Sequence, residues 1–173
     1  MPKILQQTGG DAVDIILADH RWFEDALHEL RDVRSDRAAV LADLATVLIA
    51  HAEAEESTVY PSLRYKKAID TDEVKHSEHE HDEGNRALLA LMEVQDTASE
   101  EFSEKEHELS EALSHHLDEE ERDVLNPART EVDLDVRTEL GAEFAAERAR
   151  LIDNDCGSIE NVRRIVAAID KDS

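Results

Sequence analysis

Apolar residues recur at steps of three, four and seven positions along most of the chain. This is the spacing of helices that each bury one face. The composition agrees, because Ala, Leu and Glu dominate while aromatic residues make up only 3% of the chain, with 5 Gly and 3 Pro. Strong helix formers therefore prevail, and runs of β-branched residues are absent. The pattern predicts an all-α protein.

Breaks in the periodicity divide the chain into six helical segments. We expect them over residues 11–33, 36–60, 71–94, 99–125, 133–152 and 158–169, with Thr71 or Asp72 capping the third. Pro61 is expected to bend or end the second segment, and Pro127 to follow the end of the fourth, because proline disfavours a continuing helix. Four long helices with short connections predict an up-down-up-down four-helix bundle in residues 1–130. Two additional C-terminal helices, in residues 131–173, would pack on the bundle or on another subunit.

Charge narrows the classes of partner. Acidic residues outnumber basic ones by 43 to 19, which gives a net charge of −24. Such a surface repels phosphate backbones and anionic lipids, so nucleic-acid and membrane partners are not expected. No run approaches the roughly 20 apolar residues of a membrane span, and the first ten residues lack the apolar core of a signal peptide. With a single cysteine, Cys156, a reducing cytoplasm is the expected location.

Polar residues interrupt the middle of every predicted core-facing stripe. They are His20, His51 with Glu55, His81, and His116 with Glu120. Burying an unpaired carboxylate costs several kcal/mol, so this set requires compensation, and a bound cation supplies it. Residues four apart lie about 40° from each other on a helix, so each His-x-x-x-Glu pair can direct two ligands to one point.

The angular positions of other polar residues around their helices place them away from the core-facing stripes. Five histidines should face water: His28, His76, His79, His107 and His115. Glu56 lies about 140° from His51 and is expected at the surface or behind a ligand. Tyr60 lies about 140° from Glu55 and is expected to pack rather than to take part in chemistry.

An internal repeat supports the interpretation. "DHRWFEDAL" at 19–27 matches "EHDEGNRAL" at 80–88 in an acid, the following His, and Ala-Leu at the same distance. Each copy precedes a His-x-x-x-Glu helix. The chain thus consists of two similar helical hairpins, which predicts two metal positions with carboxylates between them.

The residue types limit the metal. Mixed imidazole and carboxylate ligands suit iron, manganese or zinc, and the absence of thiolate pairs disfavours iron–sulfur clusters and structural zinc. Two glutamates are enough to bridge a pair of cations. A core site of this kind is suited to binding or reducing O₂ or peroxide.

Four stretches carry a family resemblance. "ADHRWFEDAL", "HAEAEESTVYP", "EHDEGNRALL" and "HHLDEEERDVL", within residues 11–127, resemble the ligand helices of the hemerythrin-like HHE cation-binding proteins, and the tail resembles actinobacterial members. The resemblance implies two non-haem iron ions, oxo- or hydroxo-bridged, with zinc or manganese as alternatives. It also implies terminal ligands and bridges. The terminal ligands would be His20, His51, His81 and His116, and the bridges Glu55 and Glu120.

Two departures distinguish the chain from oxygen-carrying hemerythrins. They have His-x-x-x-His on the third helix, where this chain has Ser77 four residues before His81 and Glu78 about 60° from it. They have His-x-x-x-x-Asp on the fourth helix, where this chain has His-x-x-x-Glu. A site with fewer ligands keeps an exchangeable position, so reversible O₂ carriage is not expected. Whether Glu78 or Glu119 completes the coordination stays open.

The expected ligand is a small molecule, O₂, NO or H₂O₂, bound by a monomer or homodimer. Catalase-like peroxide breakdown is one outcome, and iron or zinc buffering, or iron or oxygen sensing without turnover, is the alternative. Two interpretations without a metal compete with these: a bundle whose buried polar groups satisfy one another, and an acidic interaction module. Metal content separates the two groups of interpretations.

Overall fold

The computed structural model describes residues 3–172, the last of them by its backbone only. Within this range the chain forms helices joined by turns and loops, without a strand, which confirms the all-α prediction. The helices are α1 (Ala12–Arg31), α2 (Arg37–Ala54), η1 (Glu55–Val59), α3 (Tyr60–Tyr65), α4 (Thr71–Met92), α5 (Glu100–Glu120), η2 (Glu121–Leu125), α6 (Asn126–Glu131), α7 (Leu134–Asp153) and α8 (Ile159–Asp172).

Side-chain caps set the start of each of the four long helices. The carboxylates of Asp11, Asp36 and Asp70 and the hydroxyl of Ser99 accept a hydrogen bond from a backbone N–H in the first turn of α1, α2, α4 and α5, respectively. These are the residue types that satisfy the free donors of a helix end. The cap of α4 is therefore Asp70, and the prediction of Thr71 or Asp72 was wrong by one or two residues.

Helical structure continues through both prolines, Pro61 and Pro127. Both η1 and η2 are single π turns, in which Tyr60 N–H donates to the Glu55 carbonyl and Asn126 N–H to the Glu121 carbonyl. Pro61 and Pro127 follow directly, in the first turn of α3 and α6. In an α-helix the proline ring clashes with the carbonyl four residues earlier, and a wider turn relieves that clash. The helix end expected before Pro127 was therefore wrong, and at Pro61, where a bend or an end was expected, the helical chain does not end.

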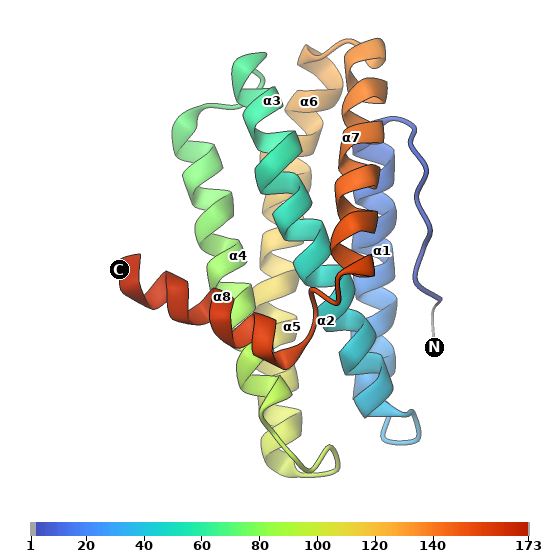
Figure 1. Ribbon diagram of the computed structural model, residues 1–173, viewed down its shortest axis with the longest axis vertical. Coiled ribbons are helices and arrows are strands. Elements are labelled where there is room, and N and C mark those ends of the chain that lie inside the picture. The colour runs from blue at the N-terminus through green and yellow to red at the C-terminus, as the bar shows by residue number, and fades with distance from the viewer. Residues whose placement is uncertain (1–2, 173) are drawn as a thin grey trace.

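The long helices lie side by side (Figure 1). Helix α1 contacts α2 and α5, and α4 contacts α2 and α5. Helix α7 lies against α1 and α2, while α8 crosses the others and contacts α4. One continuous apolar core fills the interior, from Ile16 and Phe23 of α1 to Leu109 of α5 and Phe144 of α7.

The N-terminal segment runs along the outside of the helices (Figure 1). The Lys3 carbonyl accepts a hydrogen bond from Trp22 Nε1 at 3.2 Å. At its end, the Gly10 carbonyl lies so close to Gly141 of α7 that a Cβ at Gly141 would collide with it. Glycine is thus required where α7 meets the start of α1.

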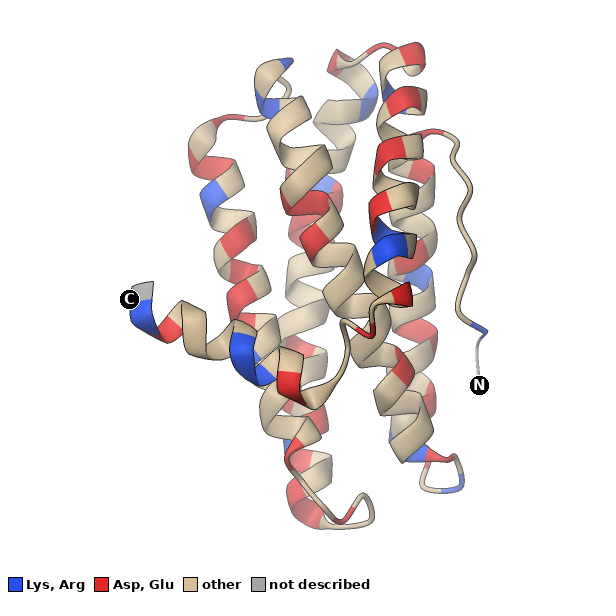
Figure 2. Ribbon diagram, in the orientation of Figure 1, with Lys and Arg blue, Asp and Glu red and all other residues tan. Residues whose placement is uncertain are grey.

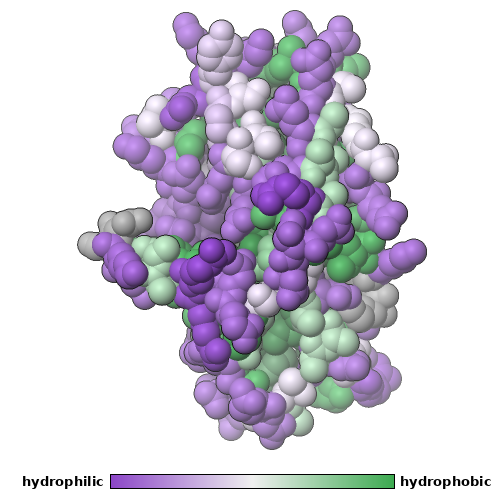
Figure 3. All heavy atoms as spheres, in the orientation of Figure 1, coloured by the Kyte–Doolittle hydropathy of each residue, from purple (hydrophilic) through white to green (hydrophobic). Residues whose placement is uncertain are grey.

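Acidic residues are frequent on the outside of the helices. Acidic residues occur on all the long helices (Figure 2), and the face in Figure 3 is largely hydrophilic with separate hydrophobic groups. Among the described helices, none combines the length and the apolar character needed to cross a membrane.

Candidate metal centre

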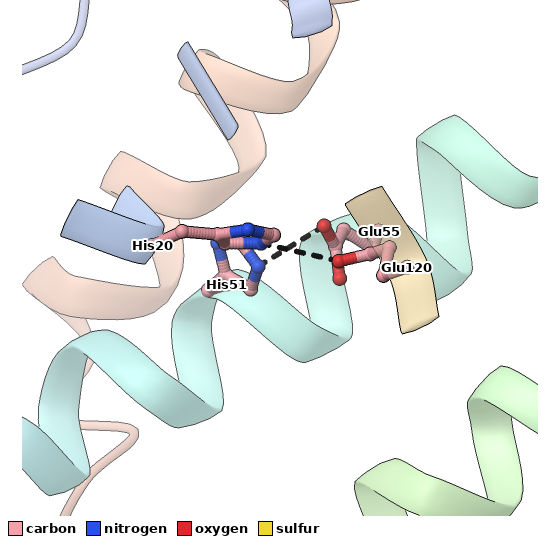
Figure 4. Close-up of side chains that lie close together, drawn as sticks. All are labelled: His20, His51, Glu55 and Glu120. Carbon is pink, nitrogen blue, oxygen red and sulfur yellow. Dashed lines mark ion pairs between the residues drawn. The ribbon is translucent and has the colours of Figure 1, made fainter. Parts of the chain in front are cut away.

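The six polar residues of the predicted stripes meet in the middle of the helices. They come from α1 (His20), α2 (His51), η1 (Glu55), α4 (His81) and α5 (His116 and Glu120), and none is more than 6% exposed. Their ligand atoms form two buried groups: His20, His51, Glu55 and Glu120; and Glu55, His81 and His116. Figure 4 shows the first group, in which two imidazoles from neighbouring helices face two carboxylates. Glu55 belongs to both groups, which is the placement that a bridging ligand requires.

The two glutamates lie between the histidine pairs. Glu55 places one oxygen 3.0 Å from His51 Nε2 and the other 3.4 Å from His81 Nε2. Glu120 Oε2 lies 3.2 Å from His20 Nε2 and 3.7 Å from His116 Nε2. Each carboxylate thus spans from one histidine pair to the other.

Four of these atoms lack a hydrogen bond although they are buried. They are His20 Nε2, His51 Nε2, Glu55 Oε1 and Glu120 Oε2, none of which has an aligned partner within the described chain. A buried polar atom without a partner costs about 1–3 kcal/mol, and native interiors rarely leave several together. The four atoms lie within 4.8 Å of one another, and a cation between them would satisfy all of them. The residues present therefore fit the metal that the sequence predicts.

A carboxylate holds the other nitrogen of every one of these imidazoles. The Nδ1 contacts are His51 to Asp19 (3.0 Å), His116 to Glu80 (2.9 Å), His20 to Glu121 (3.0 Å) and His81 to Glu56 (2.7 Å). With Nδ1–H donating to a carboxylate, Nε2 is directed at the centre, as in histidine metal sites generally.

The supporting acids follow the internal repeat. The acid before each first histidine reaches the histidine of the next long helix, and the acid after each of Glu55 and Glu120 reaches across to the other hairpin. Sequence reasoning left Glu56 between two roles and missed Asp19, Glu80 and Glu121. The signal that could have found them was present, because an acid directly precedes both His20 and His81, and a second glutamate directly follows both Glu55 and Glu120.

Helix α7 also reaches the centre. Arg148 donates through Nε and Nη2 to both oxygens of Asp19, at 2.8 and 2.9 Å, and through Nη1 to the Leu5 carbonyl. Gln7 Nε2 donates to the same carboxylate at 2.9 Å. Asp19 is fully buried and Arg148 is 2% exposed. The position of His51 is thus fixed by residues from both ends of the chain.

The placement of Tyr60 differs from the prediction. Its hydroxyl donates to Glu120 Oε1 at 2.7 Å and lies 3.3 Å from Glu55 Oε2 and 3.4 Å from His81 Nε2. The angle of about 140° from Glu55 assumed an α-helix of 3.6 residues per turn. In η1 the backbone hydrogen bond spans five residues, from Tyr60 back to Glu55, instead of four. This wider turn changes the direction of the Tyr60 side chain, which therefore faces inward. Tyr60 therefore adds a phenol oxygen to the centre.

Comparison with known protein families agrees with this geometry. The model of the hemerythrin HHE cation binding domain matches residues 11–127. The chain belongs to the hemerythrin HHE family. No curated protein and no solved structure shows significant similarity to it. The match spans the four ligand helices and ends before α7.

The other candidate residues of this HHE protein lie outside the two buried groups. The five histidines expected at the surface, His28, His76, His79, His107 and His115, are all exposed. Glu78 is half-buried and belongs to neither group, and Ser77 is buried without joining either. Glu119 lies 2.7 Å from His76 Nε2 on the outside of α4 and α5. Of the residues considered beyond the six, Tyr60 is the one that reaches the centre.

Without a metal, the centre of the HHE protein is a set of ion pairs. Burial opposes the charge of His51, but the charge of Glu55, whose Oε1 lies 3.0 Å from Nε2, and the hydrogen bond to Asp19 raise its pKa to about 10. Burial likewise opposes the charge of His81, while hydrogen bonds to Glu55 and Glu56 raise its pKa to about 10. Burial alone would raise the pKa of Glu55, yet the two histidines hold it well below its usual range.

Metal binding should therefore release protons from His51 and His81 at a pH where histidines of ordinary pKa are already neutral. At pH 8 a histidine with a pKa near 6.5 is neutral, whereas His51 and His81 of the apo-protein still carry protons. Because a metal binds neutral imidazole, loading displaces these protons. We expect about two protons per chain, measured at pH 8 by calorimetry in buffers of different ionisation enthalpy. Release of none would show that the imidazoles are neutral before the metal arrives.

The two sides of the centre differ in their surroundings. Phe23 of α1 and Phe144 of α7 pack edge-on against the His51 ring, with ring centroids 5.2 and 5.7 Å away. On the other side, a cavity of about 20 Å³ adjoins His81 and His116. Its remaining lining is mostly small or apolar: Leu48, Ala52, Glu80, Gly84, Asn85, Ala112 and Leu113. About 10–15 Å³ is enough for one water-sized molecule, so the space suits a diatomic ligand or water.

Proposed function

We propose that the protein is a non-haem di-iron protein that binds O₂, NO or hydrogen peroxide at the centre between α1, α2, α4 and α5, and that it breaks down peroxide. One observation carries the proposal. The imidazole Nε2 atoms of His20 and His51 and one oxygen each of Glu55 and Glu120 are buried, have no aligned hydrogen bond within the described chain and lie within 4.8 Å of one another. Family membership supports cation binding there. Membership alone leaves the metal and the ligand open.

The arrangement of helices fits this role. We propose that α1, α2, α4 and α5 form an up-down-up-down four-helix bundle around the centre, with α7 and α8 as the additional helices. The closed series of contacts from α1 to α2, α4, α5 and back to α1 supports it. Bundles of this type place metal ligands on facing helices.

A bridged pair of cations with redox chemistry favours iron over zinc. Nitrogen and oxygen ligands in a bridged pair suit iron or manganese, and a bound iron pair supplies the two-electron redox chemistry that peroxide breakdown requires. The chain adds a protonated hydroxyl. Burial, followed by the charges of Glu120 and Glu55, raises the pKa of Tyr60 well above its usual value. Tyr60 thus keeps its proton at neutral pH and can donate a hydrogen bond to an oxygen at the centre.

The cavity supports a small ligand. It opens beside His81 and His116, away from the ring packing of Phe23 and Phe144 around His51. Its size excludes organic substrates of ordinary dimensions. We infer that O₂, NO or peroxide approaches the centre from the side of α4 and α5.

Oxygen evolution tests the proposal. We expect the iron-loaded protein to hold about two irons per chain and to evolve O₂ when hydrogen peroxide is added, measured with an oxygen electrode. Chelator-treated protein is the control. An intact di-iron spectrum without O₂ evolution would favour binding, sensing or iron buffering. A preparation from iron-replete cells without core metal would contradict the di-iron proposal itself.

Gly84→Leu tests the approach from α4. A Cβ built at Gly84 meets nothing within 4 Å, so a larger side chain can fill the cavity without moving the backbone. Leucine is also the better helix former, which protects the fold. The variant should keep its iron and react several-fold more slowly with peroxide and NO. An unchanged rate would place the approach elsewhere.

A further inference from the structure

Two further His-x-x-x-Glu pairs face each other on the outside of α4 and α5. One pair is His76 with Glu80 on α4, and the other is His115 with Glu119 on α5. His76 Nε2 lies 2.7 Å from Glu119 Oε2 and 3.6 Å from Glu80 Oε1. His115 Nε2 lies 3.4 Å from Glu80 Oε1 and 3.7 Å from Glu119 Oε2. The ligand atoms of His76, Glu80 and Glu119 form a third group that could hold a metal ion.

One atom of this cluster is buried and unpartnered. Glu80 is only 6% exposed, and its Oε1 has no hydrogen-bond partner within the described chain. Its Oε2 is engaged by His116 Nδ1 at 2.9 Å. Oε1 instead points at the two exposed imidazoles, whose distances of 3.4 and 3.6 Å come without an aligned hydrogen bond. This buried carboxylate oxygen therefore has two imidazoles nearby but no hydrogen bond.

We propose that His76, Glu80, His115 and Glu119 form an outer binding site for a divalent transition-metal ion such as Zn²⁺. Two imidazoles and two carboxylates are a normal tetrahedral ligand set. Metal–ligand bonds of about 2.0–2.1 Å place such ligands about 3.3 Å from one another. The four N–O distances between these imidazoles and carboxylates range from 2.7 to 3.7 Å and so lie on both sides of that value. Small side-chain rotations are therefore enough to bring the four ligands around one ion.

The chain supplies an internal contrast. His79 with Glu83 and His107 with Glu111 are also His-x-x-x-Glu pairs, with N–O distances of 3.5 and 3.4 Å. All four of those side chains are at least 58% exposed. Within the described chain, Glu83 and Glu111 are each paired with the histidine of their own helix, and neither pair faces a second one across a helix interface. The outer site differs by having two pairs that face each other and a buried carboxylate between them.

Glu80 connects the outer site to the inner centre. One of its oxygens faces the outer cluster and the other accepts from His116 Nδ1, while His116 Nε2 faces the inner carboxylates. A cation on Oε1 would draw charge from the carboxylate and so weaken its hold on the His116 proton. Occupation of the outer site is therefore expected to shift the spectrum of a metal bound in the inner centre.

A Zn²⁺ titration of protein whose inner metal has been measured tests the outer site. We expect calorimetry to show about one further Zn²⁺ per chain, with the inner metal content unchanged before and after. The double variant His76→Ala, His115→Ala should weaken this binding by more than about tenfold. The matched double variant His79→Ala, His107→Ala should bind as the wild type does.

Co²⁺ gives a second measurement, because tetrahedral Co²⁺ bound by nitrogen and oxygen absorbs strongly in visible light. Its difference spectrum should develop in the wild type and the matched variant and be lost in His76→Ala, His115→Ala. Equal binding by both double variants, or none by the wild type, would overturn the outer site. None of these substitutions changes an inner ligand. A negative result for the outer site therefore does not contradict the inner centre, which the inner metal content tests separately.

Discussion

Glu55→Ala is expected to remove most of the metal from both positions of the inner centre. Glu55 alone belongs to both buried ligand groups, with one oxygen toward His51 and the other toward His81. Its loss also leaves two buried histidines of raised pKa without their shared counter-charge. Removing one member of a buried ion pair costs about 3–5 kcal/mol, so the variant should be both metal-poor and less stable.

Glu120→Ala should give a similar loss, because Glu120 Oε2 faces His20 and His116. The matched controls are Glu83→Ala and Glu111→Ala, which remove the glutamate of an exposed His-x-x-x-Glu pair. These should keep the metal content of the wild type. The measurement is metal per chain in protein purified from iron-replete cells, with circular dichroism to show that each variant is folded. Equal metal in all four variants would mean that the buried groups are not the metal centre.

Glu55→Gln separates the two effects. It keeps the size of the side chain and its capacity to accept a hydrogen bond, but it removes the charge that balances His51 and His81. We expect a folded protein with much weaker metal binding. A folded Glu55→Gln variant with full metal content would show that the carboxylate charge is dispensable.

Helical periodicity was enough to find the six central residues. His20, His81 and the two His-x-x-x-Glu pairs interrupt stripes that are otherwise apolar, and a polar residue there has to be buried wherever the helix packs. The structure brings the six into two buried groups that share Glu55. Their burial thus follows from local sequence, because each helix is regular up to its ligand.

Periodicity failed where the helix is no longer an α-helix. Tyr60 follows the π turn of η1, and the extra residue in that turn rotates its hydroxyl into the centre. The same irregularity lets the chain continue through Pro61 and Pro127, where a regular helix would have ended. The placement of Tyr60 and the helix end before Pro127 were both predicted wrongly for one reason, the presence of a π turn. A single extra residue in a turn leaves little trace in the amino-acid composition.

Long-range partners could not be read from local patterns. Arg148 lies on α7, 129 residues after Asp19, and its two hydrogen bonds to Asp19 depend on how α7 packs against α1. A domain boundary near residue 130 stays a prediction. Nevertheless, a residue beyond it orients the carboxylate that holds His51. The residues after 130 therefore have a direct physical connection to the centre.

Asp19→Ala is expected to be among the most destabilising single substitutions outside the six central residues. Asp19 is fully buried and accepts from His51, Arg148 and Gln7. Its removal leaves the Arg148 guanidinium buried without an anion, which costs about 3–5 kcal/mol of unfolding free energy. Urea unfolding of the metal-free proteins measures it. The matched control is Asp14→Ala, which breaks the exposed pair with Arg129 and should cost less than about 1 kcal/mol.

A double variant, Asp19→Leu with Arg148→Met, distinguishes support of the fold from support of the metal. Replacing a buried ion pair with apolar side chains of similar volume is often neutral, so stability should return to near the wild-type value. Metal affinity should not return, because His51 Nδ1 has lost the carboxylate that directs Nε2 to the centre, and such a loss typically weakens binding by about 10–100-fold. Competition with a chelator of known affinity measures this. If the double variant binds metal as tightly as the wild type, Asp19 acts through folding stability alone and the orientation of His51 is set by its packing against Phe23 and Phe144.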